Sequence, residues 1–180
     1  FAFCRKMSSA VLGGNLSLIG DWVFSNCESL KDVVIQSGIT QLSDSMFKDC
    51  KGLINITIPE GVTSIGAEAF SGCHALRSVN IPHSVTKIGW DAFRNCNFES
   101  IKIPNGVTTI REHVFSCCSS LERVSIPDSV EIIEKFAFSN CQNLKIIHYS
   151  GTEEQWSGVS VAKGNDLAKN KLTYHCWEED

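Results

Sequence analysis

The sequence predicts a repeat solenoid, in which short coils of about 23 residues stack along one axis. A Phe-x-x-Cys pair recurs from one end of the chain to the other, and apolar residues follow each pair at fixed offsets. Such a period is typical of a leucine-rich-repeat solenoid, because no single coil can bury its apolar positions alone. Equivalent side chains of neighbouring coils should therefore stack into one continuous core.

The recurring pair defines a ladder whose steps are 23 residues, apart from one step of 22. The phenylalanines are Phe1, Phe24, Phe47, Phe70, Phe93, Phe115 and Phe138, followed by Cys4, Cys27, Cys50, Cys73, Cys96, Cys118 and Cys141. A leucine or methionine comes three residues after most of these cysteines, and in the short repeat Phe98 takes that place one residue early. The missing residue therefore falls within 96–98.

Each coil contains a short segment such as Ser78-Val79-Asn80-Ile81, in which polar and β-branched residues alternate. This alternation predicts a half-buried strand. Proline directly follows four of these segments and should end the strand, because it lacks an N–H group and fixes φ. A second short extended piece follows, and residues 66–70 predict one helical or 3₁₀ turn on the opposite side. The expected coil has parallel strands on one face and short turns or 3₁₀ segments on the other.

The chain contains nine cysteines, an odd number, and seven of them occupy the ladder position. In-register side chains of stacked coils point the same way, which is unfavourable for a disulfide between neighbours. We therefore predict buried free thiols that behave as small apolar residues, with a paired subset as the alternative. Cys117 and Cys176 lie off the ladder, and the sequence assigns them no role.

The solenoid is expected over residues 1–149, and its first coil is the most degenerate, with Gly13-Gly14 replacing the usual turn. Phe1, Cys4 and Met7 are core-type residues with no polar outer layer, so we expect the chain to begin inside a truncated solenoid.

Residues 150–180 lose the period and predict a small C-terminal α/β cap. Thr152 and Gln155 have the spacing of a capping box, which opens a short helix. Asn165 could cap a second helix over residues 166–170, and a final strand is expected over residues 172–175.

Composition excludes several classes of protein. The net charge is -4 and the pI is near 5.7, so there is no basic stripe for nucleic acid. No apolar run approaches the roughly 20 residues of a membrane span. The start of the chain is not a signal peptide, so any targeting segment would lie upstream.

Laid out in register, the repeat from Cys73 to Phe93 resembles the BspA-like class of leucine-rich repeats, and the resemblance extends over residues 1–149. Residues 149–156 are similar to the closing segment of such proteins from anaerobic bacteria. The resemblance implies a secreted or cell-surface protein that binds host or microbial macromolecules, extracellular-matrix proteins among them. It carries no catalytic signature and no cofactor.

No catalytic or phosphate-binding motif is present, so the sequence does not indicate an enzyme. His113, Cys117 and Cys118 have a spacing that could ligate zinc, but Cys118 belongs to the inward ladder, and a surface histidine is the favoured interpretation. We expect no metal site. Trp22, Trp90 and Phe136 precede the ladder phenylalanines on the back, where local packing is favoured over a binding role.

The outward residues of the strands form two rows that vary while the core repeats. They predict a ligand-binding surface, because solenoids generally bind through their extended faces. A merely solvated surface is the alternative, as is a passive spacer or an accessory domain of a surface enzyme. The candidate residues are Asp32, Asn55, Thr57, Ser78, Asn80, Ser100, Lys102, Arg123, Ser125 and His148.

Overall fold

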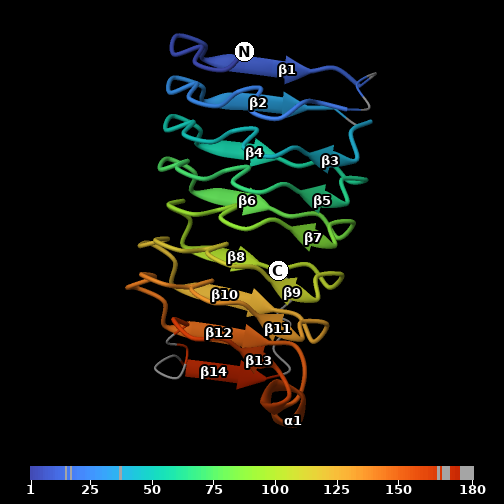
Figure 1. Cartoon of the computed structure of the whole chain (residues 1–180), viewed down its shortest axis with the longest axis vertical. Coiled ribbons are helices and arrows are strands. Elements are labelled where there is room, and N and C mark those ends of the chain that lie inside the picture. The colour runs from blue at the N-terminus through green and yellow to red at the C-terminus, as the bar shows by residue number, and fades with distance from the viewer. Residues whose placement is uncertain (15, 17, 37, 166, 168–170, 175–180) are drawn as a thin grey trace.

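A computed structural model describes residues 1–14, 16, 18–36, 38–165, 167 and 171–174. The chain forms a stack of coils, each of which contributes one strand to a long wall of parallel strands (Figure 1). Equivalent strands pair in register, so that Val33 lies opposite Ile56, and Ile56 opposite Val79. The strands of this wall are β1 (Ser9–Leu12), β2 (Asp32–Ile35), β4 (Asn55–Thr57), β6 (Ser78–Asn80), β8 (Ser100–Lys102), β10 (Arg123–Ile126), β12 (Ile146–Tyr149) and β14 (Lys171–Tyr174).

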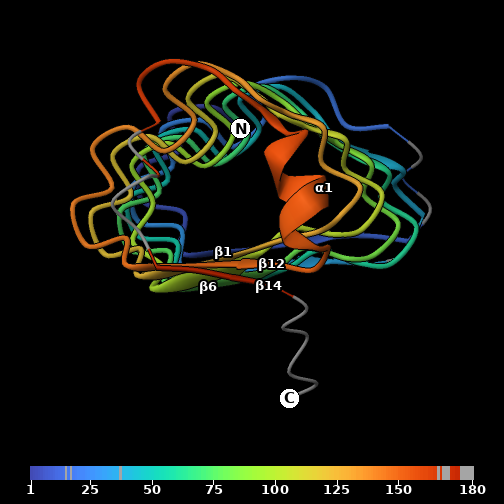
Figure 2. The ribbon, with the colours of Figure 1, turned by 90° about the horizontal axis from the view of Figure 1, so that it is seen from below.

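A second, shorter wall of parallel strands follows the turn after each of these strands. Figure 2, which looks along the stack, shows that the two walls and the remaining turns enclose the core. The period, the parallel strands and the turns confirm the predicted solenoid. The second wall consists of β3 (Gln41–Leu42), β5 (Ser64–Ile65), β7 (Lys87–Ile88), β9 (Thr109–Ile110), β11 (Ile132–Ile133) and β13 (Ser160–Val161).

The ladder phenylalanines form a continuous stack inside the coils. Neighbouring rings are nearly parallel, with centroids 5.5 Å apart between Phe24 and Phe47 and 5.3 Å apart between Phe70 and Phe93. Each ladder thiol from Cys27 onward donates a hydrogen bond to the carbonyl of the phenylalanine in the preceding coil, as Cys73 does to Phe47 at 3.2 Å. All described cysteines are free, as predicted. The repeated Phe-x-x-Cys pair thus joins successive coils in two ways, by stacking of the phenylalanine rings and by a hydrogen bond from the thiol.

The back of each coil differs from the predicted helical or 3₁₀ turn. Residues 66–70 instead form turns, with Glu68 in the left-handed region at φ 54°. The same backbone recurs at Trp22, Ser45, Asp91, His113 and Phe136, and again four residues further on in each coil. It turns amide groups toward the next coil, so that the Glu68 N–H donates to the Trp90 carbonyl at 2.9 Å. These bonds between coils favour the left-handed turns over a local helical turn.

The short repeat interrupts both walls. In the described residues, hydrogen-bonded pairing runs from β1 to β6 and resumes from β8 to β14, while the second wall is divided between β7 and β9. Phe98 is fully buried beside this interruption and meets Phe93 and Phe115 edge to face, with centroids 6.1 and 6.3 Å away. A larger side chain therefore fills the core where one residue is missing.

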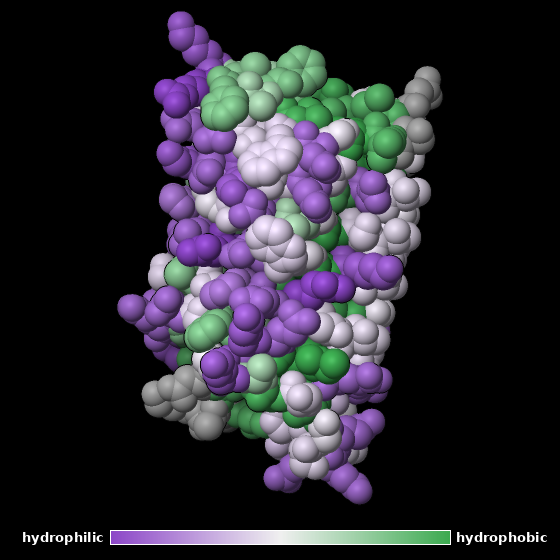
Figure 3. All heavy atoms as spheres, in the orientation of Figure 1, coloured by the Kyte–Doolittle hydropathy of each residue, from purple (hydrophilic) through white to green (hydrophobic). Residues whose placement is uncertain are grey.

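The two ends of the stack differ. At the N-terminal end, Phe1, Phe3, Val11 and Leu18 are all more than half exposed, and Figure 3 shows apolar side chains gathered there. At the other end, helix α1 (Glu153–Ser157) lies across the last coil (Figure 2). Its capping box at Thr152 and Gln155 is formed as predicted, and β14 forms at the predicted final strand. The helix expected over residues 166–170 lies almost entirely outside the described residues.

Candidate functional site

The predicted ligand-binding residues lie side by side on the outer surface of the long wall, which we call the strand face. Register pairing aligns Asp32 with Asn55 and Ser78, and it aligns Ser100 with Arg123. The neighbouring row contains Thr57 beside Asn80, and then Lys102, Ser125 and His148. The alternating pattern positions these side chains outward, because successive residues of a strand point to opposite sides.

Most of the strand face is exposed, polar and composed of small side chains. Ser78 donates to the Asn55 side chain at 3.0 Å, which links two coils. Ser125 and His148 are only half-exposed, and His148 Nδ1 lies 2.6 Å from the Thr173 hydroxyl in β14. The N-terminal part of the strand face is therefore more accessible than its C-terminal part.

A second polar surface lies on the turns, and we call it the turn face. It is built on the first left-handed residue of each coil and the residue before it, and three of these residues, Ser45, Ala67 and Asp91, are buried. The full set is Asp21, Trp22, Asp44, Ser45, Ala67, Glu68, Trp90, Asp91, Glu112, His113, Lys135 and Phe136. Trp22 and Trp90 are 49% and 48% exposed, which is unlike the local packing expected from the sequence. Phe136 is less exposed and stacks on His113 with ring centroids 5.3 Å apart.

Charged groups cross-link the turn face. Lys48 lies 5.2 Å from the centre of the Trp22 ring and 2.7 Å from a carboxylate oxygen of Glu68. Glu68 also accepts a hydrogen bond from the Ser45 hydroxyl at 3.0 Å. Further along, Glu112 pairs with Lys135 at 3.2 Å. These contacts hold the long side chains of the turn face in defined positions.

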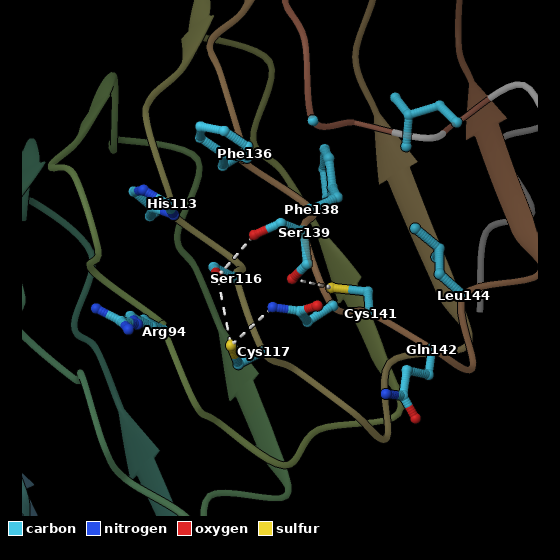
Figure 4. Close-up of a pocket in the computed structure, with 13 residues that line it drawn as sticks. Arg94, His113, Ser116, Cys117, Phe136, Phe138, Ser139, Cys141, Gln142 and Leu144 are labelled. Atoms are coloured by element: carbon cyan, nitrogen blue, oxygen red, sulfur yellow. Dashed lines mark hydrogen bonds between the residues drawn. The ribbon is translucent and has the colours of Figure 1, made fainter.

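A groove of about 710 Å³ opens near the C-terminal end of the turns (Figure 4). Its wall combines apolar side chains, among them Phe138 and Leu144, with polar groups from three successive coils. Ser116 and Ser139 lie 2.9 Å apart across two coils. His113 Nδ1 is buried and has no hydrogen-bond partner, while its Nε2 lies 3.5 Å from Glu112.

Cys117 lies in this groove and is the off-ladder cysteine that the structure describes. A hydrogen bond with the Ser116 hydroxyl lowers the pKa of its thiol, against partial burial, and the Asn140 amide and the Arg94 charge act in the same direction. The buried ladder thiols behave in the opposite way, because burial raises the pKa of Cys50 to about 12 and raises the pKa of Cys73 well above its ordinary value. Among the described cysteines, Cys117 therefore combines partial exposure with a lowered thiol pKa, which favours reaction at this position.

The directions of the side chains do not support a zinc site at His113, Cys117 and Cys118. Cys118 points into the core and donates to the Phe93 carbonyl at 3.2 Å, away from Cys117. Among the described residues, no three histidine, cysteine or carboxylate side chains come together as a metal site. Cys176 lies outside the described residues. No helix in the described part of the chain is both long and apolar enough to cross a membrane.

Sequence reasoning singled out Trp22 and Trp90 but favoured local packing for them, and it missed the links across the turn face. The Lys48–Glu68 pair joins two different repeat offsets, so the period alone does not bring the two residues together. A signal was present in Trp22 and Trp90, since neither keeps its identity in the other coils as a core position would.

Comparison with known proteins was made for sequence and for structure. The family model of the BspA type leucine-rich repeat region matches residues 1–54 and 40–158, in six copies. No curated protein matches the sequence significantly. A leucine-rich repeat protein from Bacteroides ovatus superposes with a TM-score of 0.74 at 26% identity, over 93% of this chain and 45% of that protein.

Two further solved structures are similar. The leucine-rich repeat protein of T. pallidum gives a TM-score of 0.72 at 28% identity, over 80% of this chain and 68% of that protein. One from Eubacterium ventriosum gives 0.68 at 24% identity, over 82% and 40%, and shows likeness of fold alone. The chain therefore spans less than half the length of the proteins from B. ovatus and E. ventriosum.

Proposed function

Because the chain belongs to the BspA-type leucine-rich-repeat family, we propose that it is an extracellular or cell-surface recognition module that binds a protein through its strand face. The repeat fold is typical of protein-interaction modules, and the similar solved structures are leucine-rich repeat proteins of bacteria. A host or microbial surface protein, such as one of the extracellular matrix, is the proposed partner.

The observation that carries this proposal is the register of the outward rows. Asp32, Asn55 and Ser78 occupy equivalent places on a buried, repeating core, yet they differ in charge and hydrogen-bonding capacity. A fixed backbone with variable side chains suits recognition, because the binding groups are positioned before the partner arrives. A passive spacer would need only the stable repeating core and no particular outward side chains. An accessory domain of an enzyme would need a catalytic domain beside it.

The first experiment captures a partner and measures its affinity for a strand-face variant. We expect simultaneous replacement of Asn80, Lys102 and Arg123 by Glu to weaken binding at least tenfold, because it reverses charge on neighbouring strands. The fold should persist, since each surface change costs within about 0.5 kcal/mol.

The matched control replaces Gln41, Lys87 and Lys163 by Glu and changes the net charge by the same amount. These residues lie on or beside the second wall and are exposed. Equal loss of affinity in both variants would mean that net charge, and not the strand face, governs binding. A chain that binds no surface or matrix protein at all would support the spacer.

A further inference from the structure

We infer that the turn face is a second binding surface and that it takes a protein segment carrying two lysine or arginine side chains. This inference does not depend on the strand face, because the two surfaces share no residue. It follows from the exposure of two tryptophans, the exposed carboxylates beside Trp22 and the fixed positions of the side chains between the two rings.

The tryptophans provide the anchors. Trp22 and Trp90 each leave about half of their surface in solvent, although both belong to turns that are tied to the next coil by backbone hydrogen bonds. Exposed tryptophan on a rigid support is the side chain most often found at the centre of protein interfaces. Three coil steps separate the two residues, which corresponds to about 14 Å at the usual spacing of parallel strands.

The charge around Trp22 favours a cationic partner. Asp21 and Asp44 flank Trp22, both are exposed, and neither is ion-paired within the described part of the chain. Each uses one oxygen to accept a backbone N–H from the next coil, at 3.1 Å for Asp21 and 2.8 Å for Asp44. The carboxylates are therefore held in place while their charge faces solvent.

The structure itself shows how a cation lies on this surface. Lys48 rests over the Trp22 ring and is oriented by Glu68, whose backbone is bonded to the carbonyl of Trp90. A cation over an indole ring is attracted by the electrons of the ring face. The exposed part of each indole offers the same contact to a side chain from outside.

The spacing of the anchors specifies the partner segment. An extended chain advances about 3.3 Å per residue, so cationic side chains four residues apart match the separation of Trp22 and Trp90. Little ordering is required of the protein, because Lys48, Glu68 and Ser45 are already joined. Such preorganisation reduces the entropic cost of binding.

The test uses a capped five-residue peptide with lysine at both ends and glycine or serine between them. Titration into the full chain is followed by the indole N–H resonances in a proton–nitrogen NMR spectrum. We expect the Trp22 and Trp90 signals to move together and saturate, and the Trp156 signal to remain unchanged. The same peptide with glutamate at both ends should have no effect.

Two variants separate charge from fold. Asp21→Asn with Asp44→Asn keeps the oxygen that accepts the backbone N–H and removes the charge, and we expect at least fivefold weaker binding with a smaller dependence on salt. Glu60→Gln with Glu131→Gln is the matched control, because it also removes two exposed carboxylate charges but lies outside both faces, and it should leave the affinity unchanged. Trp22→Asn, which suits the left-handed backbone, should reduce the affinity by a similar or larger factor.

Three outcomes would overturn the inference. The first is equal binding of the glutamate and lysine peptides. The second is a response of the indole signals to a neutral oligosaccharide but not to the lysine peptide. The third is movement of those signals with protein concentration alone, which would mean that a second copy covers this face. None of these outcomes bears on the strand face, which is tested by its own triple variant.

Discussion

The thiol of Cys117 differs from the ladder thiols in its surroundings, and the difference is measurable. Only the thiolate reacts with alkylating reagents, so a lower pKa gives reaction at lower pH. We expect Cys117 to be labelled in a fast phase in the native protein, with its midpoint below pH 9.0, the ordinary thiol value. Cys50, whose pKa is about 12, should remain unlabelled there.

The control for this prediction is Cys117→Ser, which should remove the fast phase and leave the fold intact. Mass spectrometry of the labelled protein identifies the modified residue. Native labelling of Cys73 or Cys96 at a comparable rate would contradict the burial of the ladder. After denaturation, the eight described cysteines should all react, because each of them is free.

The partner of each ladder thiol was beyond what the sequence could predict. Periodicity placed Cys73 in the core, and the structure confirms this, but the carbonyl of Phe47 became its acceptor only through the stacking of one coil on the next. The same reason applies to the strand face and the turn face. The strand rows follow from alternation within a segment, whereas the Lys48–Glu68 pair depends on how two turns lie against each other.

At the scale of the element, the short repeat lacks one residue of the repeating pattern, and a larger side chain compensates for it in the core. Phe98 is fully buried between Phe93 and Phe115. We expect Phe98→Ala to lower the free energy of unfolding by about 3 to 5 kcal/mol, because it leaves a cavity beside the interrupted walls. Urea denaturation followed by circular dichroism measures this loss.

Phe1 provides the comparison for Phe98, since it has the same chemistry but is 74% exposed. Phe1→Ala should cost much less than Phe98→Ala. Similar losses for the two variants would show that Phe98 does not fill a core position.

The elements were predictable to the extent that local pattern determined them. Alternation located the strand at Ser78–Asn80, proline located its end, and the capping box located α1. The turns were not predictable in the same way, since Trp22, Glu68 and Phe136 are unusual in a left-handed conformation. Hydrogen bonds from these turns to the neighbouring coil stabilise that conformation, and no single repeat contains them.

At the scale of the whole molecule, we propose that residues 150–180 act as a cap. Helix α1 places Trp156 against Tyr149, with ring centroids 5.0 Å apart, and β13 and β14 pair with the last strands of the two walls. Deletion of residues 150–180 would expose Ile147 and the edges of β11 and β12. We expect the shortened protein to associate or aggregate, because unpaired strand edges recruit other chains.

Sedimentation velocity over a range of concentrations tests the proposed cap. The intact chain serves as the reference, since it carries the same exposed N-terminal coil. A shortened chain that stays monomeric and melts at the same temperature as the intact chain would show that the segment is dispensable.

The proposal that the strand face recognises a protein is tested most directly by carbene footprinting of the chain, free and bound to its captured partner. We predict reduced labelling at Asn55, Asn80, Lys102 and Arg123, with unchanged labelling at Gln41, Lys87 and Ile132 on the second wall. Unchanged labelling of the strand face in the complex, together with protection of the second wall or of the ends of the stack, would contradict this proposal.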